Sequence, residues 1–377
     1  MRFPRAFLWF WTSFCVLAAG SCQRASGQAA LLLEDAAGFS SVLSPSGHVA
    51  LYFARICADT PTRLRRCGPG ELGTVISRYE GIKGRDWLAI PLLPHLYAVE
   101  DPLTVPTHVD HASVAELRQA YHDAHLTVLG NVPVGGRLMP GWNQLVGAAF
   151  ERRIYAFRFE TTPEQDDALI ARLNDSPQVP HFNFITRNCA DFVSDILNEY
   201  FPGAFKRRIL PDAGITMPRQ TAYQLECYAR KHPELHLQLM EIPQIPGYRR
   251  ESGRSKSVAG SLVFTGDLIP LALLDPYVAA GVLADYLIFG RYPLARRHPE
   301  ILSPQTMAIL AGSAISNMGS ANMSIAEAAS QGVSGVAGPA NANSTNQSAG
   351  GSTNPGDAET TPGGEALEAN AARQAHR

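Results

Sequence analysis

An amphipathic stretch near the middle of the chain, RNCADFVSDILNEYF at 187–201, places the strongest constraint on the fold. Its apolar residues recur at helical spacing, and its acidic and amide residues fall on the opposite side. Asn188 stands at the N-cap position, and Asp191 follows three residues later, as in a capping box. Pro202 and Gly203 end the pattern. The sequence therefore predicts a helix that must bury one face against another layer.

The predicted helix begins at a cysteine, since Cys189 directly follows the N-cap. Backbone N–H groups and the positive end of the helix dipole favour a thiolate there, and they can lower a cysteine pKa from about 8.5 to roughly 3.5–7.5. Cys189 is thus a candidate nucleophile. The alternative is a buried structural cysteine, because free cysteines often pack as small apolar side chains.

The N-terminal residues predict export. Arg2 and Arg5 precede an apolar run of signal-peptide length, which is followed by small residues. We expect 1–28 to be a signal peptide and the protein to be periplasmic or anchored in the envelope. The sequence AGSC, which ends at Cys22, resembles a lipobox. Lipidation of Cys22, with membrane anchoring, therefore stands beside simple cleavage as an outcome.

Export also permits disulfide bonds. Cys57 and Cys67 lie at the two ends of a short loop that contains a proline, and we expect them to be bonded to each other. Cys189 and Cys227 then remain. They are either free thiols or a second pair, and pairing would make Cys189 inert.

The composition is that of an ordinary globular protein, with 45% hydrophobic residues, 18% charged residues and a net charge of −2. Basic residues form only short clusters, so we expect no nucleic-acid partner. We expect a catalytic domain at 38–211 and a helical extension at 212–312. A tail at 317–377, rich in Ala, Ser, Asn and Gly, is predicted to be disordered.

The predicted catalytic domain mixes strands and helices and belongs to the α+β class. Alternating apolar and polar residues predict strands at 47–56, 73–81 and 151–160. Capping signals predict a helix at 113–125 with Ser113 as its N-cap, and another at 162–177. The segment 86–106 contains four prolines and is predicted to be extended and irregular.

A strongly apolar stretch follows at 258–290. It is interrupted by Asp267, Asp275 and Asp285 and by two prolines. Because charged side chains are rare in the core of a bilayer, we expect packed helices here rather than a membrane span. A location at the membrane interface is the alternative.

A nucleophilic cysteine needs an imidazole within hydrogen-bond reach. His48 is the candidate, because it follows Gly47 at the start of a predicted strand and a rigid element would hold its side chain in place. The alternative is an ordinary surface or core histidine. A metal site is a further alternative, because paired histidines flank the helix predicted at 113–125, namely His108, His111, His122 and His125.

Two motifs, in this order along the chain, resemble those of the circularly permuted papain-like cysteine enzymes. GHVALYF at 47–53 and RNCADFV at 187–193 are similar to the histidine and cysteine motifs of this group, which includes NlpC-type and lecithin:retinol acyltransferase-like enzymes. The chain most resembles the Lnb N-terminal periplasmic domain family, through Tyr79–Gly81, the strand RRIYAFRFE and the HFNF lead into Cys189. The resemblance implies an antiparallel sheet with a cysteine-bearing helix, and catalysis by Cys189 and His48.

From these features we predict an exported thiol hydrolase or acyltransferase that acts on an amide or ester bond in the cell envelope, without a cofactor. Its substrate would be a peptide, a lipopeptide or an acyl ester. The third catalytic residue is left open among Ser77, Tyr79 and Glu80 on the second predicted strand. The alternative is a non-catalytic envelope-binding protein on a papain-like scaffold.

Overall fold

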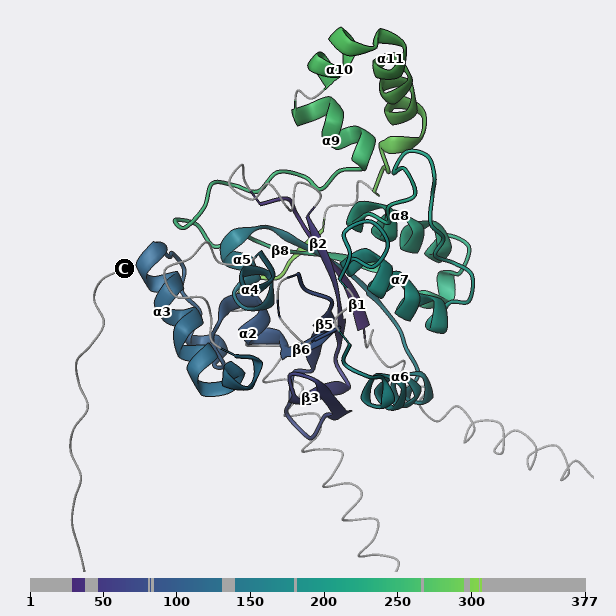
Figure 1. The fold of residues 1–377 in the computed structure, drawn as a ribbon. Coiled ribbons are helices and arrows are strands. Elements are labelled where there is room, and N and C mark those ends of the chain that lie inside the picture. The colour runs from purple at the N-terminus through teal and green to yellow at the C-terminus, as the bar shows by residue number, and fades with distance from the viewer. Residues whose placement is uncertain are drawn as a thin grey trace, which may run out of the picture. The chain divides into compact units, whose positions relative to one another are not determined.

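The computed structural model describes residues 29–37, 47–80, 82, 85–130, 140–179, 182–265, 268–294, 299–304 and 306. The predicted signal peptide at 1–28 and the predicted tail at 317–377 lie outside the described residues. The described part is a mixed α+β structure with a mostly antiparallel sheet and helices (Figure 1). The predicted class is therefore confirmed.

Seven strands form the main sheet, in the order β6-β5-β2-β1-β7-β8-β9. Neighbouring strands are antiparallel except for β8 and β9. In chain order the strands are β1 (Ala29–Glu34), β2 (His48–Phe53), β5 (Thr74–Ser77), β6 (Leu88–Pro91), β7 (Ile154–Phe159), β8 (Gln238–Ile242) and β9 (Glu300–Ile301). β1 and β8 lie outside 38–211, so the sheet extends beyond the predicted catalytic domain in both directions along the chain.

The side chains of β2 alternate between two cores, one on each face of the sheet. Val49 and Leu51 belong to one core, and Ala50 belongs to the other. Because successive residues of a strand point to opposite faces, His48 shares the face of Ala50. The register of β1 and β2 places Glu34 directly opposite His48. The alternation predicted for the strand at 47–56 is confirmed.

Helices pack against both faces of the sheet (Figure 1). The helices that share the core of Val49 are α6 (Pro163–Asp175), α7 (Cys189–Tyr200) and α8 (Pro218–Ala229). Those that share the core of Ala50 are α2 (Leu92–Tyr97), α3 (His111–Tyr121), α4 (Pro140–Leu145) and α5 (Ala148–Glu151). Short 3-10 or π turns lie at η1 (Pro102–Thr104), η2 (His122–Leu126), η3 (Thr127–Leu129) and η4 (Pro233–Leu235).

Two local predictions are wrong. The segment 86–106 is not irregular throughout, because β6 and α2 lie within it. Pro94 stands in the first turn of α2, where a missing N–H group removes no intrahelical hydrogen bond. The N-cap of α3 is Asp110 rather than Ser113, since Asp110 accepts a hydrogen bond from the N–H of Ser113 and the Ser113 hydroxyl completes the capping box.

A two-stranded hairpin, β3 (Ile56–Thr60) and β4 (Arg63–Arg66), follows β2. Cys57 and Cys67 are joined by a disulfide bond across its base, which confirms the predicted bridge. The hairpin is thereby closed covalently at the end nearest β2, the strand that begins at His48.

The apolar stretch 258–290 forms a group of helices, consisting of α9 (Val258–Thr265), α10 (Leu268–Leu274), α11 (Pro276–Asp285) and the π turn η5 (Tyr286–Gly290) (Figure 1). The buried carboxylate of Asp212 accepts hydrogen bonds from the N–H of Val258, at 2.9 Å, and from the hydroxyl of Tyr292. The entry and the exit of the group therefore meet at one side chain. Helices were expected here, but many of their large apolar side chains are exposed rather than packed.

Candidate active site

The N-terminus of α7 is built as the sequence predicts. Asn188 is the N-cap, and its Oδ1 accepts hydrogen bonds from the N–H groups of Ala190, at 2.8 Å, and Asp191, at 3.0 Å. Asp191 Oδ2 accepts one in return from the N–H of Asn188, at 3.2 Å. This reciprocal capping satisfies three backbone donors of the first turn. Cys189 is consequently fixed as the first residue of the helix.

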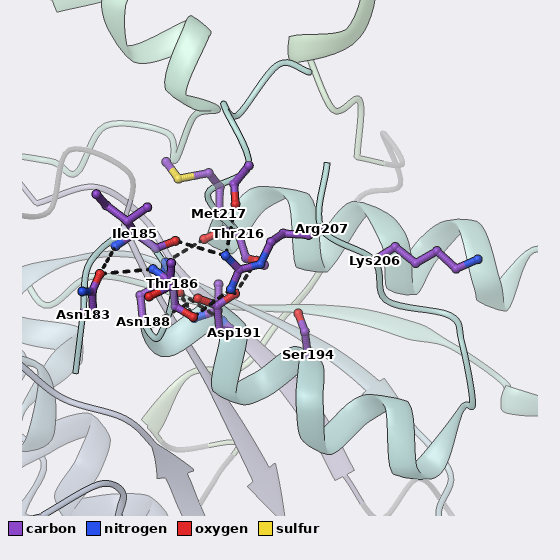
Figure 2. Close-up of polar contacts among 12 residues, drawn as sticks. Asn183, Ile185, Thr186, Asn188, Asp191, Ser194, Lys206, Arg207, Thr216 and Met217 are labelled. Carbon is purple, nitrogen blue, oxygen red and sulfur yellow. Dashed lines mark hydrogen bonds and ion pairs between the residues drawn. The ribbon is translucent and has the colours of Figure 1, made fainter. Parts of the chain in front are cut away.

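Asp191 also anchors the segments on either side of α7 (Figure 2). Its Oδ1 accepts hydrogen bonds from Arg207 Nη2, at 2.7 Å, and from the hydroxyl of Thr216. The same nitrogen of Arg207 donates to the carbonyl of Thr186, at 2.7 Å, and Asn188 Nδ2 donates to the carbonyl of Thr216, at 3.0 Å. The carboxylate of Asp191 thus holds Thr216, which follows α7 in the chain, directly, and it holds the turn at Thr186, which precedes α7, through Arg207. The position of Cys189 is set by this network.

His48 begins β2 and is almost completely buried, with 2% of its surface exposed. Its ring stacks on Tyr79, with 5.1 Å between the ring centroids. His48 Nε2 is buried and has no hydrogen-bond partner among the described residues. Gly47 precedes it with φ at +83°, and a Cβ there would overlap the carbonyl oxygen of Glu34. The glycine is therefore required for the chain to enter β2 beside β1.

Cys189 and His48 border the same small cavity, which has a volume of about 30 Å³. That volume is enough for roughly one or two water molecules. Residues from several segments complete its lining, namely Gly47, Glu80, Gln144, Phe182, Phe184, Asn188, Thr216, Met217 and Pro218. The two residues that the sequence singled out, one on a strand and one on a helix, are thus brought to one place.

A buried carboxylate that the sequence did not reveal lies beside His48. Glu34 is fully buried opposite His48, with His95 Nε2 at 3.3 Å and Arg152 Nε at 3.8 Å from its two oxygens. Burial raises the pKa of Glu34, but the charge of His48, the adjacent His95 and the charge of Arg152 together hold it below its usual value. Glu34 is therefore a carboxylate whose negative charge favours protonation of His48.

The three residues proposed for the third catalytic role occupy different positions. Ser77 donates its hydroxyl to the carbonyl of Val49, at 2.8 Å. Tyr79 stacks on His48, and Glu80 lines the cavity. Glu34 lies before residue 38, where the predicted domain began. The one signal for it was the apolar run LLLE, which reads as a buried strand that ends in an acid.

The thiol of Cys189 differs from the expectation. Burial raises its pKa to about 12, and the charges of Glu34 and Asp191 act in the same direction. Hydrogen bonds from the N–H groups of Val49 and Ala190 act in the opposite direction but are outweighed. The predicted lowering of the pKa by the helix N-terminus is therefore wrong, since that prediction left desolvation out of account.

His48 is likewise neutral at pH 7. Burial lowers its pKa to about 4, although the charge of Glu34 opposes the change. At pH 7 the thiol of Cys189 and the imidazole of His48 are consequently both uncharged.

The histidines considered for a metal site have other partners. His122 contacts the carbonyl of Gly130 at 2.9 Å through Nε2, and His125 lies 3.2 Å from Glu100. His111 packs edge-on against Tyr248. Among the residues that the structure describes, the one group of three close ligand atoms is that of Cys57, Cys67 and Glu71, and its two cysteines are already bonded to each other. The four histidines do not come together.

The second cysteine pair also does not form, because Cys189 and Cys227 are both free thiols. Cys227 Sγ accepts a hydrogen bond from Arg230, at 2.8 Å.

No protein-family model, curated protein or solved structure matches the chain. The reading of the site therefore depends on its geometry.

Proposed function

We propose that the protein is an exported thiol hydrolase or acyltransferase with a circularly permuted papain-like fold, and that it cleaves an amide or ester bond in the cell envelope. One observation carries the proposal. A free cysteine at the first position of a capped helix and a buried histidine at the first position of a strand border the same cavity. A nucleophile and a base on rigid elements are what acyl transfer by a thiol needs.

In the proposed reaction, Cys189 Sγ attacks the carbonyl carbon while His48 takes the thiol proton. Glu34 stabilises the resulting imidazolium, and the N–H group of Val49 stabilises sulfur as it gains charge. His48 then returns the proton to the leaving amine or alcohol, and a thioester remains on Cys189. Water completes a hydrolase cycle, and a second amine or alcohol completes a transferase cycle.

The negative charge that develops on the carbonyl oxygen of the substrate also needs a hydrogen-bond donor. The N–H groups of Ala190 and Asp191 already donate to Asn188 Oδ1. Of the first three N–H groups of α7, that of Cys189 is the one left for an oxyanion. The cavity has room for the reacting carbonyl alone, so the rest of a substrate would lie outside it, near the exposed Phe184.

Selective labelling tests the proposal. The full chain is treated at neutral pH with a small haloacetamide, and adducts at Cys189 and Cys227 are quantified by peptide mass mapping. We expect Cys189 to react faster than Cys227, and we expect His48→Ala to abolish the difference. His111→Ala, at an exposed histidine, is the matched control. Equal or slower reaction of Cys189 would overturn the proposal.

A second candidate is a non-catalytic envelope-binding protein on the same scaffold. The raised pKa of Cys189 and the small volume of the cavity favour it. The labelling experiment distinguishes the two candidates. In a binding protein, a merely buried Cys189 thiol would react more slowly than Cys227, and His48→Ala would not change its rate.

A further inference from the structure

The group formed by α9, α10, α11 and η5 presents an exposed apolar surface. Six of its exposed apolar side chains define what is called here the apolar helical surface: Ile269 (69%), Leu273 (83%), Leu274 (85%), Tyr277 (88%), Ile288 (69%) and Phe289 (48%). Large apolar side chains that are exposed in such number on one short segment usually mark a site of contact with another apolar phase.

Few charges interrupt this surface among the described residues of α10, α11 and η5. Asp275 is one, and its carboxylate is occupied as the N-cap of α11, where it accepts from the N–H groups of Tyr277 and Val278 at 2.9 and 3.1 Å. Asp285 is the other, and one of its oxygens is buried. Asp275 is exposed and uses only its Oδ1 in this cap, so one carboxylate lies next to Leu274 at the edge of the surface.

A cavity of about 660 Å³ lies at the base of the same helices. Four cationic side chains line it, those of Arg219, Arg254, Lys256 and Arg291. Phe264 of α9 and Tyr286 of η5 line it as well, so it is continuous with the helical group. We call it the cationic cavity.

The positive charge of this cavity is poorly compensated. Within the described part of the chain, none of the four cations forms an ion pair with a carboxylate. Arg219 donates instead to the carbonyls of Arg291, at 3.3 Å, and Ser255, at 3.4 Å. The carboxylates of Asp35 and Glu226 each offset part of the charge of Arg219, and Lys256 Nζ lies 4.7 Å from the ring centre of Phe264. Four cations that line one cavity without a direct ion pair among the described residues are suited to a multivalent anionic partner.

We propose that the apolar helical surface and the cationic cavity form one membrane-docking surface, in which the helices enter the lipid interface and the four cations contact the phosphates of anionic lipids. An apolar face flanked by cations has the chemistry of a segment that lies in the interface. No described helix is long and apolar enough to cross a membrane. The proposal stands independently of the catalytic one.

The first test locates the contact by hydrogen–deuterium exchange of the full chain, with vesicles of phosphatidylglycerol or of phosphatidylcholine. We expect phosphatidylglycerol to protect peptides from 268–290 and 254–256, and phosphatidylcholine to protect them much less. Hydrogen–deuterium exchange is measured for each peptide, so protection caused by binding through the N-terminal apolar run would be seen in other peptides than those from 254–290. The absence of protection at 268–290 would overturn the proposal, as would protection of 254–256 by inorganic phosphate alone.

The second test compares variants in vesicle flotation. Leu273→Ser with Leu274→Ser, and separately Arg254→Glu with Lys256→Glu, should each weaken phosphatidylglycerol binding by about tenfold or more. Leu103→Ser is the matched control for the apolar variant, because Leu103 is 84% exposed outside this surface. Unchanged binding in either double variant would refute the proposal. So would a dimer in solution that the leucine variant dissociates.

Discussion

The burial of His48 predicts a specific dependence of stability on pH. Its pKa is lowered from an ordinary value of 6.5 to about 4 in the folded protein. Between these values the unfolded chain binds a proton at His48 that the folded protein does not, so acidification favours unfolding. The contribution is absent above about pH 7 and grows as the pH falls towards 4. At about 1.4 kcal/mol for each pKa unit, the loss reaches about 3 kcal/mol.

The perturbation is His48→Gln, which removes the titrating group and keeps a polar side chain of similar length. Urea unfolding of both proteins, followed by circular dichroism at intervals from pH 7.5 to 4.5, gives the two free energies of unfolding. The free energy of the wild-type protein should fall more steeply below pH 6.5 than that of the variant. The difference between them should change by about 2–3 kcal/mol.

The difference in free energy of unfolding between the wild-type protein and His48→Gln is the quantity to measure, because other titrating groups change the stability in the opposite direction. Burial raises the pKa of Asp35 and of Asp212 to about 6, so these carboxyls favour the folded state as the pH falls below that value. Both are present in the two proteins and cancel. His111→Gln, at an exposed histidine, is the matched control. Parallel curves for wild type and His48→Gln would refute the burial of a neutral imidazole at this position.

Three further substitutions test the residues around the site, and a fourth, Gly203→Ala, is the control for the first. Gly47→Ala should lower the free energy of unfolding by about 2 kcal/mol or more in urea melts, because it adds an overlap with the neighbouring strand to a left-handed backbone. Gly203→Ala, which shares the positive φ but meets open space, should cost only about 1 kcal/mol. Asp191→Asn should lower the free energy of unfolding by about 1.5–3 kcal/mol, because it removes the charged acceptor of Arg207 and Thr216, and unchanged stability would contradict the anchoring role. Cys57→Ser should lower the free energy of unfolding by about 2–3 kcal/mol and leave the labelling of Cys189 unchanged.

What the sequence could predict was mainly local. The N-cap at Asn188 and its capping box with Asp191 depend on residues three positions apart, and the alternation in β2 depends on neighbours. Both predictions are confirmed. The helix α2 was missed because its prolines read as breaks, although a proline in the first turn is tolerated.

The remaining features depend on pairings across long stretches of chain. Glu34 is opposite His48 only because β1 and β2 adopt one particular register. Arg207 and Thr216 reach Asp191 from beyond α7. The pKa of Cys189 depends on how far the folded protein removes the half-buried thiol from water, and a helix N-terminus read from sequence carries no measure of that desolvation. Such quantities follow from tertiary structure alone.

The two hydrogen bonds that Asp212 accepts hold the two ends of the helical group together, so the group could be removed as a unit. Val258 and Tyr292 bind one carboxylate, and Ser257 Oγ donates to the carbonyl of Gly290 at 2.8 Å, so the chain leaves the sheet domain and re-enters it at nearly the same point. A linker of a few residues could close this gap without moving either end, and shortening the loop would even reduce its closure entropy. The helices can thus be excised or exchanged for another segment while the connectivity of the seven-stranded sheet is kept.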